Sequence, residues 1–414
     1  MQVLYPRCAG LDVHKDTIVA CIRIAAEGKV STEVRTFAAT TAGLCALAEW
    51  LVENGVTHVA MEATGIYWKP VWHILSDYPL EVILANAAHV KNVPGRKTDV
   101  NDATWLAELL AHGLIRASFV PPREVAELRT LLRTRKQLVR EHASHVQRVQ
   151  KTLEDANIKL TSAISDIMGK SGRAMIEAMI AGESDPHKLA ALADRRVQAP
   201  RAKLVEALTG RVGAQHRFLL RLHLRQIDAI DDAISEIDAE VEAHLGPFRE
   251  AVKLLDTIDG VDVLAAEVIL SEIGLDMTRF PTDGHLLSWG CICPRNDESA
   301  GKRRSTRIRK GARWLKATLI QCARAAVRMQ GRYLSALYRR IRARRGDKKA
   351  ILAVAAAILT AAYHMLKTGT PYRDLGPRHF EPAKRNALAR NLLKRLQGLG
   401  FTVDIKETAA AQPG

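Results

Sequence analysis

Residues 8–24, CAGLDVHKDTIVACIRI, contain the pattern that decides the predicted fold of the first part of the chain. CAGLDV is an apolar run that carries Asp12 near its end, and TIVACIRI is rich in β-branched residues. The stretch therefore predicts two strands joined by a turn at His14, Lys15 and Asp16. Residues 31–38, STEVRTFA, alternate polar and apolar side chains and predict a third strand.

Helix and strand patterns alternate after these three strands. Residues 41–54, 67–77 and 98–112 have helical periodicity, and the apolar runs THVAME and EVILAN between them predict short strands. Such an order is typical of an α/β domain, which we place at residues 1–120 because Pro121 and Pro122 follow.

The rest of the chain is predicted to be mainly helical. Residues 123–158 and 216–245 interleave apolar and charged residues without a break, which predicts two long helices and a coiled-coil arm over 121–246. Shorter helices are expected between them, at the tip of a helical hairpin. A C-terminal domain over 247–372 and a basic tail over 373–414 complete the organisation. The Ala-rich stretch 350–366 is short for a membrane span, so we interpret it as a packing helix.

The charge of the chain predicts a polyanionic partner. With 61 Lys and Arg against 45 Asp and Glu, the net charge is +16, for which nucleic acid is the usual partner and an acidic membrane surface the next. Residues 301–350 hold eighteen Lys and Arg and one acid. We expect nucleic acid to contact a set of basic residues there: Lys302, Arg303, Arg304, Arg307, Arg309, Lys310 and Arg313.

Nothing in the sequence predicts secretion or a zinc site. The N-terminus reaches Asp12 before any apolar run develops, so we expect no signal peptide. We therefore expect the protein to be located in the cytoplasm. The six cysteines include one CxC pair, Cys291 and Cys293, without a second pair at zinc-finger spacing. We interpret the cysteines as small buried hydrophobic residues.

Four acidic residues form the candidate catalytic constellation. Asp12 and Glu62 lie at predicted strand ends, and Asp99 and Asp102 are spaced to share one face of a predicted helix. Taken singly, each is more often a cap or a surface charge. Together they would supply the hard oxygen ligands that Mg²⁺ or Mn²⁺ prefers, and two such ions can clamp the reacting oxygens of a phosphodiester. Ser299, in PRNDESAGKRR, is a candidate nucleophile that would need such help.

Several motifs together resemble the transposases of insertion-sequence family one-ten: GLDVHKDTIVA, VAMEATGIYW, ANAAHVKNVPGRKTDVNDA, LDTIDGV and SAGKRRSTRIRKG. The resemblance implies a RuvC-like domain of the RNase H fold with a DEDD metal site, whose acids fall on Asp12, Glu62, Asp99 and Asp102. It also implies a C-terminal domain with a nucleophilic serine, which falls on Ser299, although Ser-Ala-Gly stands here where many relatives have Ser-Gly. Such proteins use a structured guide RNA, called a bridge RNA, and work as dimers or tetramers.

Three other classes of protein stay open on the residues alone. A RuvC-type junction nuclease would use the same acids with water as the nucleophile and give Ser299 no role. An ATP-binding protein of the actin and sugar-kinase type is disfavoured, because GLDVHKD lacks the second glycine of a phosphate loop. A non-catalytic nucleic-acid-binding scaffold would explain the charge and the long helices without metal.

Overall fold

The computed structural model of the chain describes residues 3–63, 65–85, 90, 102–115, 117–294, 297–299, 302–305 and 307–400; the side chains of 297–299, 302–305 and 381–388 lie outside this description. The chain divides into two compact units, Met1–Val120 and Pro121–Gly414.

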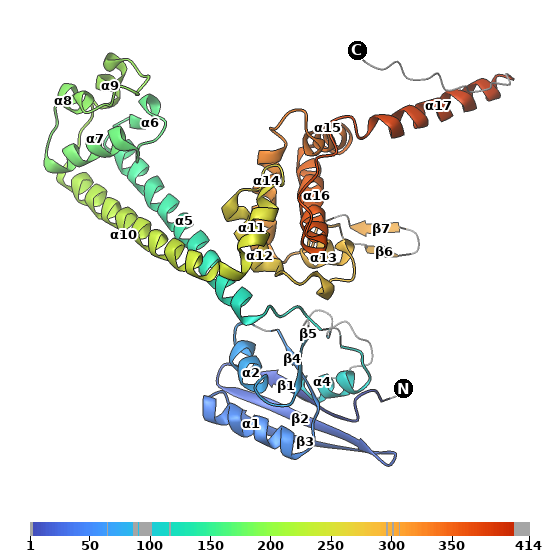
Figure 1. Cartoon of the computed structure of the whole chain (residues 1–414). Coiled ribbons are helices and arrows are strands. Elements are labelled where there is room, and N and C mark those ends of the chain that lie inside the picture. The colour runs from blue at the N-terminus through green and yellow to red at the C-terminus, as the bar shows by residue number, and fades with distance from the viewer. Residues whose placement is uncertain are drawn as a thin grey trace. The chain divides into compact units, whose positions relative to one another are not determined.

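The first unit contains a five-stranded sheet with the strand order β3-β2-β1-β4-β5. β2 is antiparallel to β1 and β3, whereas β1, β4 and β5 are parallel. The elements are β1 (Arg7–Val13), β2 (Thr17–Ala26), β3 (Lys29–Ala38), α1 (Thr41–Glu53), β4 (His58–Glu62), α2 (Trp68–Leu75), β5 (Glu81–Ala85) and α4 (Asp102–Ala111). This arrangement confirms the mixed α/β layout that the sequence predicts (Figure 1).

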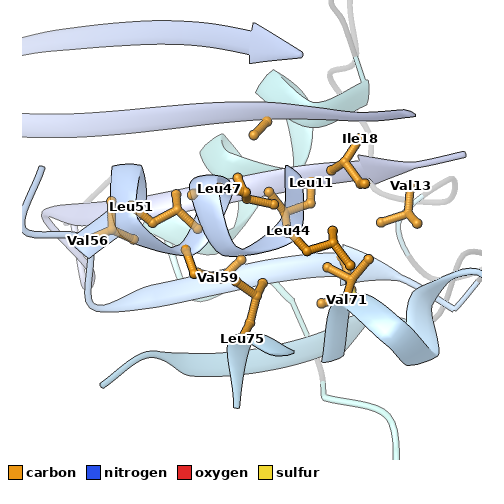
Figure 2. Close-up of a cluster of buried hydrophobic side chains, with 14 of the residues drawn as sticks. Leu11, Val13, Ile18, Leu44, Leu47, Leu51, Val56, Val59, Val71 and Leu75 are labelled. Carbon is orange, nitrogen blue, oxygen red and sulfur yellow. The ribbon is translucent and has the colours of Figure 1, made fainter. Parts of the chain in front are cut away.

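One face of the sheet forms the main hydrophobic core of the first unit with α1 and α2 (Figure 2). Because alternate residues of a strand point to the same side, Leu11 and Val13 of β1 enter this core together. Leu44 and Leu51 of α1 meet them at helical spacing. The helix begins where the Thr40 hydroxyl accepts a hydrogen bond from the Gly43 amide at 3.2 Å.

The opposite face of the sheet is covered by α4, and Gly10 makes this close packing possible. A Cβ atom at Gly10 would lie 2.1 Å from the carbonyl oxygen of Ala103, so any larger residue would displace the helix. The Cys8 thiol donates to the carbonyl oxygen of Ala107 at 3.4 Å. The helix and β1 therefore run in opposite directions, with the start of α4 over the carboxyl end of β1.

The second unit begins with an antiparallel helix pair, α5 (Arg123–Asp155) and α10 (Ala214–His244) (Figure 1). Arg135 pairs with Asp238 near one end of the pair, and Asp155 pairs with His216 near the other. Four short helices, α6 (Leu160–Ala163), α7 (Lys170–Ala181), α8 (Pro186–Ala191) and α9 (Arg201–Ala207), share a core with the two long helices at the far end.

In the described residues after α10, the regular elements are helices apart from one small hairpin, which agrees with the predicted helical C-terminal half. Its elements are η1 (Gly246–Phe248), α11 (Arg249–Asp256), α12 (Val263–Ile273), η2 (Met277–Arg279), α13 (Asp283–Trp289), β6 (Asp297–Ser299), β7 (Lys302–Ser305), α14 (Arg313–Ala326), α15 (Tyr333–Arg345), α16 (Asp347–Thr368) and α17 (Glu381–Gly398).

Helix α16 contains the apolar stretch that the sequence analysis interprets as a packing helix. Among the described residues it alone is long and apolar enough to cross a membrane, by length and composition, and half of its most apolar window is buried inside the protein. It packs against α11, α13, α14 and α15. The buried Tyr363 hydroxyl donates to the carbonyl oxygen of Phe280 at 3.0 Å. These contacts support the interpretation as a packing helix.

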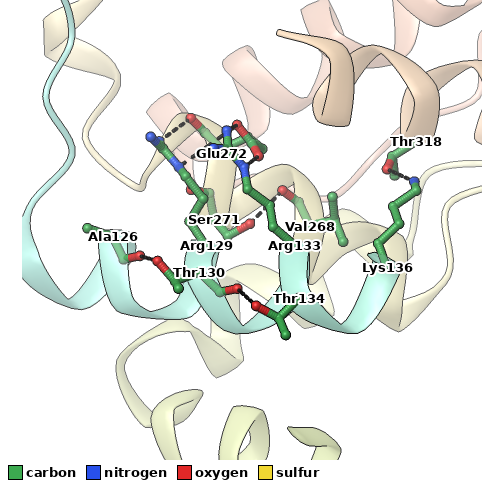
Figure 3. A network of polar contacts seen from close by, with 10 residues as sticks. All are labelled: Ala126, Arg129, Thr130, Arg133, Thr134, Lys136, Val268, Ser271, Glu272 and Thr318. Carbon is green, nitrogen blue, oxygen red and sulfur yellow. Dashed lines mark hydrogen bonds and ion pairs between the residues drawn. The ribbon is translucent and has the colours of Figure 1, made fainter. Parts of the chain in front are cut away.

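A buried ionic network joins α5 to the end of α12 (Figure 3). The Glu272 side chain is 3% exposed and accepts two hydrogen bonds of 2.8 Å from the Arg133 guanidinium. Arg129 donates to the carbonyl oxygens of Ser271 and Glu272, both at 2.8 Å, and so caps the helix. Burial lowers the pKa of Arg129 to about 10, and the Glu272 carboxylate counteracts this shift.

We predict that Glu272→Ala destabilises the second unit by about 1–3 kcal/mol, because Arg129 and the partly exposed Arg133 lose their shared counter-charge and its hydrogen bonds. The free energy of unfolding in urea, followed by circular dichroism of the helices, measures the effect. Glu236→Ala, at an exposed position of α10, is the matched control and should change the value by less than about 0.5 kcal/mol. Equal stabilities of the two variants would contradict the prediction.

Candidate functional site

Asp12 and Glu62 lie side by side on adjacent parallel strands. The register of β1 and β4 pairs Gly10 with Ala60 and Leu11 with Met61, so Asp12 and Glu62 are the next residues along each strand. Neighbouring strands are about 4.8 Å apart. Asp12 lies two residues beyond Gly10, whose face packs against α4, and therefore points to the same side as α4.

Asp102 reaches the same edge of the sheet from α4. It is the first residue of this helix and directly precedes Ala103, whose carbonyl oxygen lies over Gly10. Asp102 is exposed and Glu62 is half-buried, and the Asp12 side chain is 29% exposed. The fold thus brings three of the four predicted acids, from three separate elements, to one accessible edge.

The fourth predicted acid, Asp99, lies outside the described residues. Within the ranges that are described, no group of three or more His, Cys, Asp or Glu side chains is close enough to hold a metal ion. The backbone places Asp12, Glu62 and Asp102 at the same end of the sheet, but their side chains are not close enough to one another to hold a metal ion.

His14 is a neighbour of the acidic site that the sequence analysis treats only as a turn residue. Its Nε2 lies 3.1 Å from Oδ2 of Asp12, and its amide donates to the carbonyl oxygen of Thr17 in the β1–β2 turn. The signal in the sequence is the Asp-x-His spacing at a strand end, since residues two apart share a face. A ring nitrogen here orients the Asp12 carboxylate.

Ser299 lies at the end of β6, in the hairpin that the sequence analysis does not predict. The register of the two strands pairs Ser299 with Lys302 and Glu298 with Arg303. The backbone therefore places the candidate nucleophile opposite a basic residue, beside the turn of the hairpin. The side chain of Ser299 lies outside the described part of the chain.

The basic residues predicted to contact nucleic acid divide into two groups. Lys302, Arg303 and Arg304 lie on β7, beyond the described side chains. The other four, further along the chain, are exposed: Arg307, Arg309, Lys310 and Arg313.

Hydrogen bonds hold this second basic group in place. The guanidinium of Arg309 donates to the carbonyl oxygen of Ser288 at 3.0 Å. Lys316, on the first turns of α14, donates to the carbonyl oxygen of Arg309 at 2.9 Å. These contacts tie Arg309 to the helices on either side of it, α13 and α14.

Two family models match the chain. Residues 9–158 match a transposase model, the DEDD transposase of IS110, and residues 252–339 match the transposase IS116/IS110/IS902 family. No curated protein matches the chain at a significant level. The first match contains all four predicted acids and implies dependence on a divalent metal in general terms, and the second contains Ser299 and the basic residues. Together the two matches cover more than half of the 414 residues, and the chain belongs to the IS110 family of transposases.

Proposed function

We propose that this transposase cuts and rejoins DNA strands through the hydroxyl of Ser299, assisted by a divalent-metal site of Asp12, Glu62, Asp99 and Asp102. The observation that carries the proposal is the placement of Asp12, Glu62 and Asp102 at one edge of the sheet, from β1, β4 and α4. The order β3-β2-β1-β4-β5, with β2 antiparallel to its neighbours, supports an RNase H or RuvC-like fold for residues 1–120.

The donor set of the acidic site fits a hard divalent cation. All four side chains are carboxylates, which favour Mg²⁺ or Mn²⁺ over softer metals. When bound, such a cation supplies positive charge to the phosphodiester at which charge develops. The contact between His14 and Asp12 supports this role, because a ring nitrogen that orients a carboxylate fixes the direction of its remaining oxygen.

The chemistry assigned to Ser299 is a pair of phosphoryl transfers. The serine oxygen attacks phosphorus, a bond from serine oxygen to phosphorus forms, and the bond to one DNA oxygen breaks. The serine hydroxyl loses its proton in this step, and the DNA oxygen that leaves takes up a proton. In the second transfer a DNA hydroxyl attacks the phosphoserine link, rejoins the strand and returns the proton to Ser299. The pairing of Ser299 with Lys302 supports the assignment, since a cation beside the nucleophile stabilises phosphorane-like charge.

The partners and the remaining architecture follow from the family and the charge. DNA binding is implied by the transposase family, and we propose that the second partner is a structured guide RNA. We also propose that α5 and α10 form a coiled-coil arm within residues 121–246 that supports a dimer or tetramer. Residues 247–372 would form the serine domain, residues 373–414 a basic tail, and the site of action would be the cytoplasm.

The alternative function is a RuvC-type junction endonuclease that uses water as its nucleophile. The acids at the sheet edge support the nuclease and the transposase equally. Only a role for Ser299 as the nucleophile distinguishes the two functions. The nuclease would hydrolyse DNA with no covalent link to protein, whereas the serine enzyme would pass through one.

The test is the reaction of the purified chain with a plasmid that carries the ends of its own element, together with RNA transcribed from that element. We expect cleavage in Mg²⁺, and after denaturation in detergent a fraction of the DNA should remain covalently bound to protein. EDTA should abolish both. Cleavage without any adduct would favour the nuclease, and cleavage that persists in EDTA would refute the metal site.

A further inference from the structure

Four basic residues form a stripe along one face of α5. Arg129, Arg133, Lys136 and Arg140 follow one another at spacings of four, three and four residues, which places them on the same side of a helix. All four side chains reach α12 or α14. The stripe continues from a half-buried end at Arg129 to an exposed end at Arg140.

The first two cations of the stripe share one carboxylate. Glu272 pairs with Arg133 at 2.8 Å and lies 3.8 Å from Arg129. One negative charge thus faces two positive charges, and the site keeps a positive balance. Arg129 and Arg133 therefore hold α5 against α12 through this one acid.

Lys136 extends the stripe toward α14. Its ammonium donates to the hydroxyl of Thr318 at 3.1 Å. Burial lowers the pKa of Lys136, and the positive charge of Arg140 lowers it further, whereas Glu272 acts in the opposite direction. Lys136 and Arg140 thus bring two further cations toward the exposed end of the stripe.

At that end, three guanidinium groups surround the indole of Trp314. The guanidinium carbon lies 4.7 Å from the ring centroid for Arg140, 5.0 Å for Arg313 and 6.0 Å for Arg133. Trp314 is half-buried, and Arg140 and Arg313 are exposed. Attraction between a cation and the ring face holds each guanidinium near the indole, although the three charges repel one another.

Arg313 precedes Trp314 in the chain and Arg133 is also held by Glu272, whereas Arg140 reaches the indole from a different helix and brings a further cation to the same ring. Repulsion among cations is relieved when an anion binds between them, and the planar fork of arginine donors fits phosphate oxygens. Arg313 also ends the run of exposed cations that begins at Arg307. The cluster is therefore continuous with the basic segment along the chain, and it adds α5 to the same surface.

We propose that Trp314, Arg140 and Arg313 form a binding site for the phosphodiester backbone of nucleic acid. The inference rests on the nucleic-acid binding in the proposed function and does not depend on Ser299 or on the acids. In this site the indole positions the guanidinium groups and the arginines contact phosphate. The middle of α5 and the start of α14 then bind the same stretch of backbone.

The first test removes Arg140, which is exposed, so that Arg140→Gln should fold normally. Its matched control is Arg225→Gln, which removes the same charge from an exposed position of α10. Binding of a labelled duplex DNA is measured by fluorescence anisotropy between about 50 and about 200 mM salt, and an RNA duplex of equal length is measured in parallel. Raising the salt over this range weakens DNA binding. Each phosphate contact that a variant loses should make this loss of affinity about threefold smaller. We expect this reduction for Arg140→Gln and not for Arg225→Gln.

The second test removes the ring without changing the charge. Trp314→Leu should weaken binding by about threefold at fixed salt, because the guanidinium groups lose their common support, and Trp314→Phe should restore part of the affinity. Thermal unfolding of each variant shows whether the fold is intact.

The outcomes separate this site from the proposed function. A loss of affinity for DNA or for RNA supports the site and identifies which backbone it binds. If Arg140→Gln and Trp314→Leu both behave like Arg225→Gln, the site is refuted, while nucleic-acid binding elsewhere on the chain stands. If the unaltered chain binds neither duplex, the nucleic-acid part of the proposed function fails with it.

Discussion

Asp12→Asn should reduce DNA cleavage by the chain at least about 100-fold while leaving its fold and its DNA binding intact. The change replaces one carboxylate oxygen by an amide nitrogen in a side chain of nearly the same size. Asp12 lies beside Glu62 on the neighbouring strand and at the edge where α4 begins with Asp102. Loss of its charge would remove a central ligand from the proposed metal site. The rate of cleavage of element ends in Mg²⁺ measures the effect.

The chain offers a matched control four residues further on. Asp16 lies in the turn after β1 and is exposed, so Asp16→Asn removes the same charge from the same hairpin without touching the acidic edge. We expect cleavage by this variant within about twofold of the unaltered chain. The assignment of Asp12 would be wrong if the two variants cleaved at similar rates. Calorimetric titration with Mn²⁺ gives a second readout, in which only Asp12→Asn should weaken binding.

Much of the first unit can be predicted from sequence because its elements follow simple periodicities. The first two strands of residues 7–38 are apolar and rich in β-branched residues, the third alternates, their hairpin turns are short, and Gly55 and Gly113 follow the helices that end before them. The placement of Asp12 and Glu62 at strand ends is part of that pattern. The side of the sheet on which they lie, facing α4, cannot be predicted in this way, because it depends on the contact of Gly10 with Ala103, 93 residues away in sequence.

The parts that sequence reasoning misses rest on contacts between distant segments or on weak local signals. Strands β6 and β7, DES and KRRS, are short and consist of polar and charged residues without the alternation that predicts a strand. Glu272 looks like any acid near a helix end, yet it pairs with Arg133, 139 residues earlier in the chain. The basic segment is visible as composition, but its connection to α5 through Trp314 requires the packing of α5 against α14.

Ser299→Ala should abolish the covalent link between the chain and DNA, and strand transfer should fall by about 1,000-fold or more, since loss of a nucleophile leaves only the contribution of binding. The control is Ser305→Ala at the other end of the same hairpin, where Ser305 pairs with Asp297. That variant should keep its adduct and its activity within about twofold. An adduct that forms at normal levels in Ser299→Ala would show that another group attacks the DNA.

The two catalytic variants together test whether one subunit supplies the acids and another the serine. The acids lie in the first unit and Ser299 in the second. Each variant lacks one of these two parts, so neither variant alone has all the proposed catalytic residues. If the site is composite, a mixture of Asp12→Asn and Ser299→Ala should recombine DNA well above either variant alone, because a mixed oligomer joins intact acids to an intact serine. Absence of rescue, with each variant still assembling and binding DNA, would place both halves of the site in one subunit. Rescue would also establish that the active enzyme is an oligomer, since monomers cannot exchange catalytic groups.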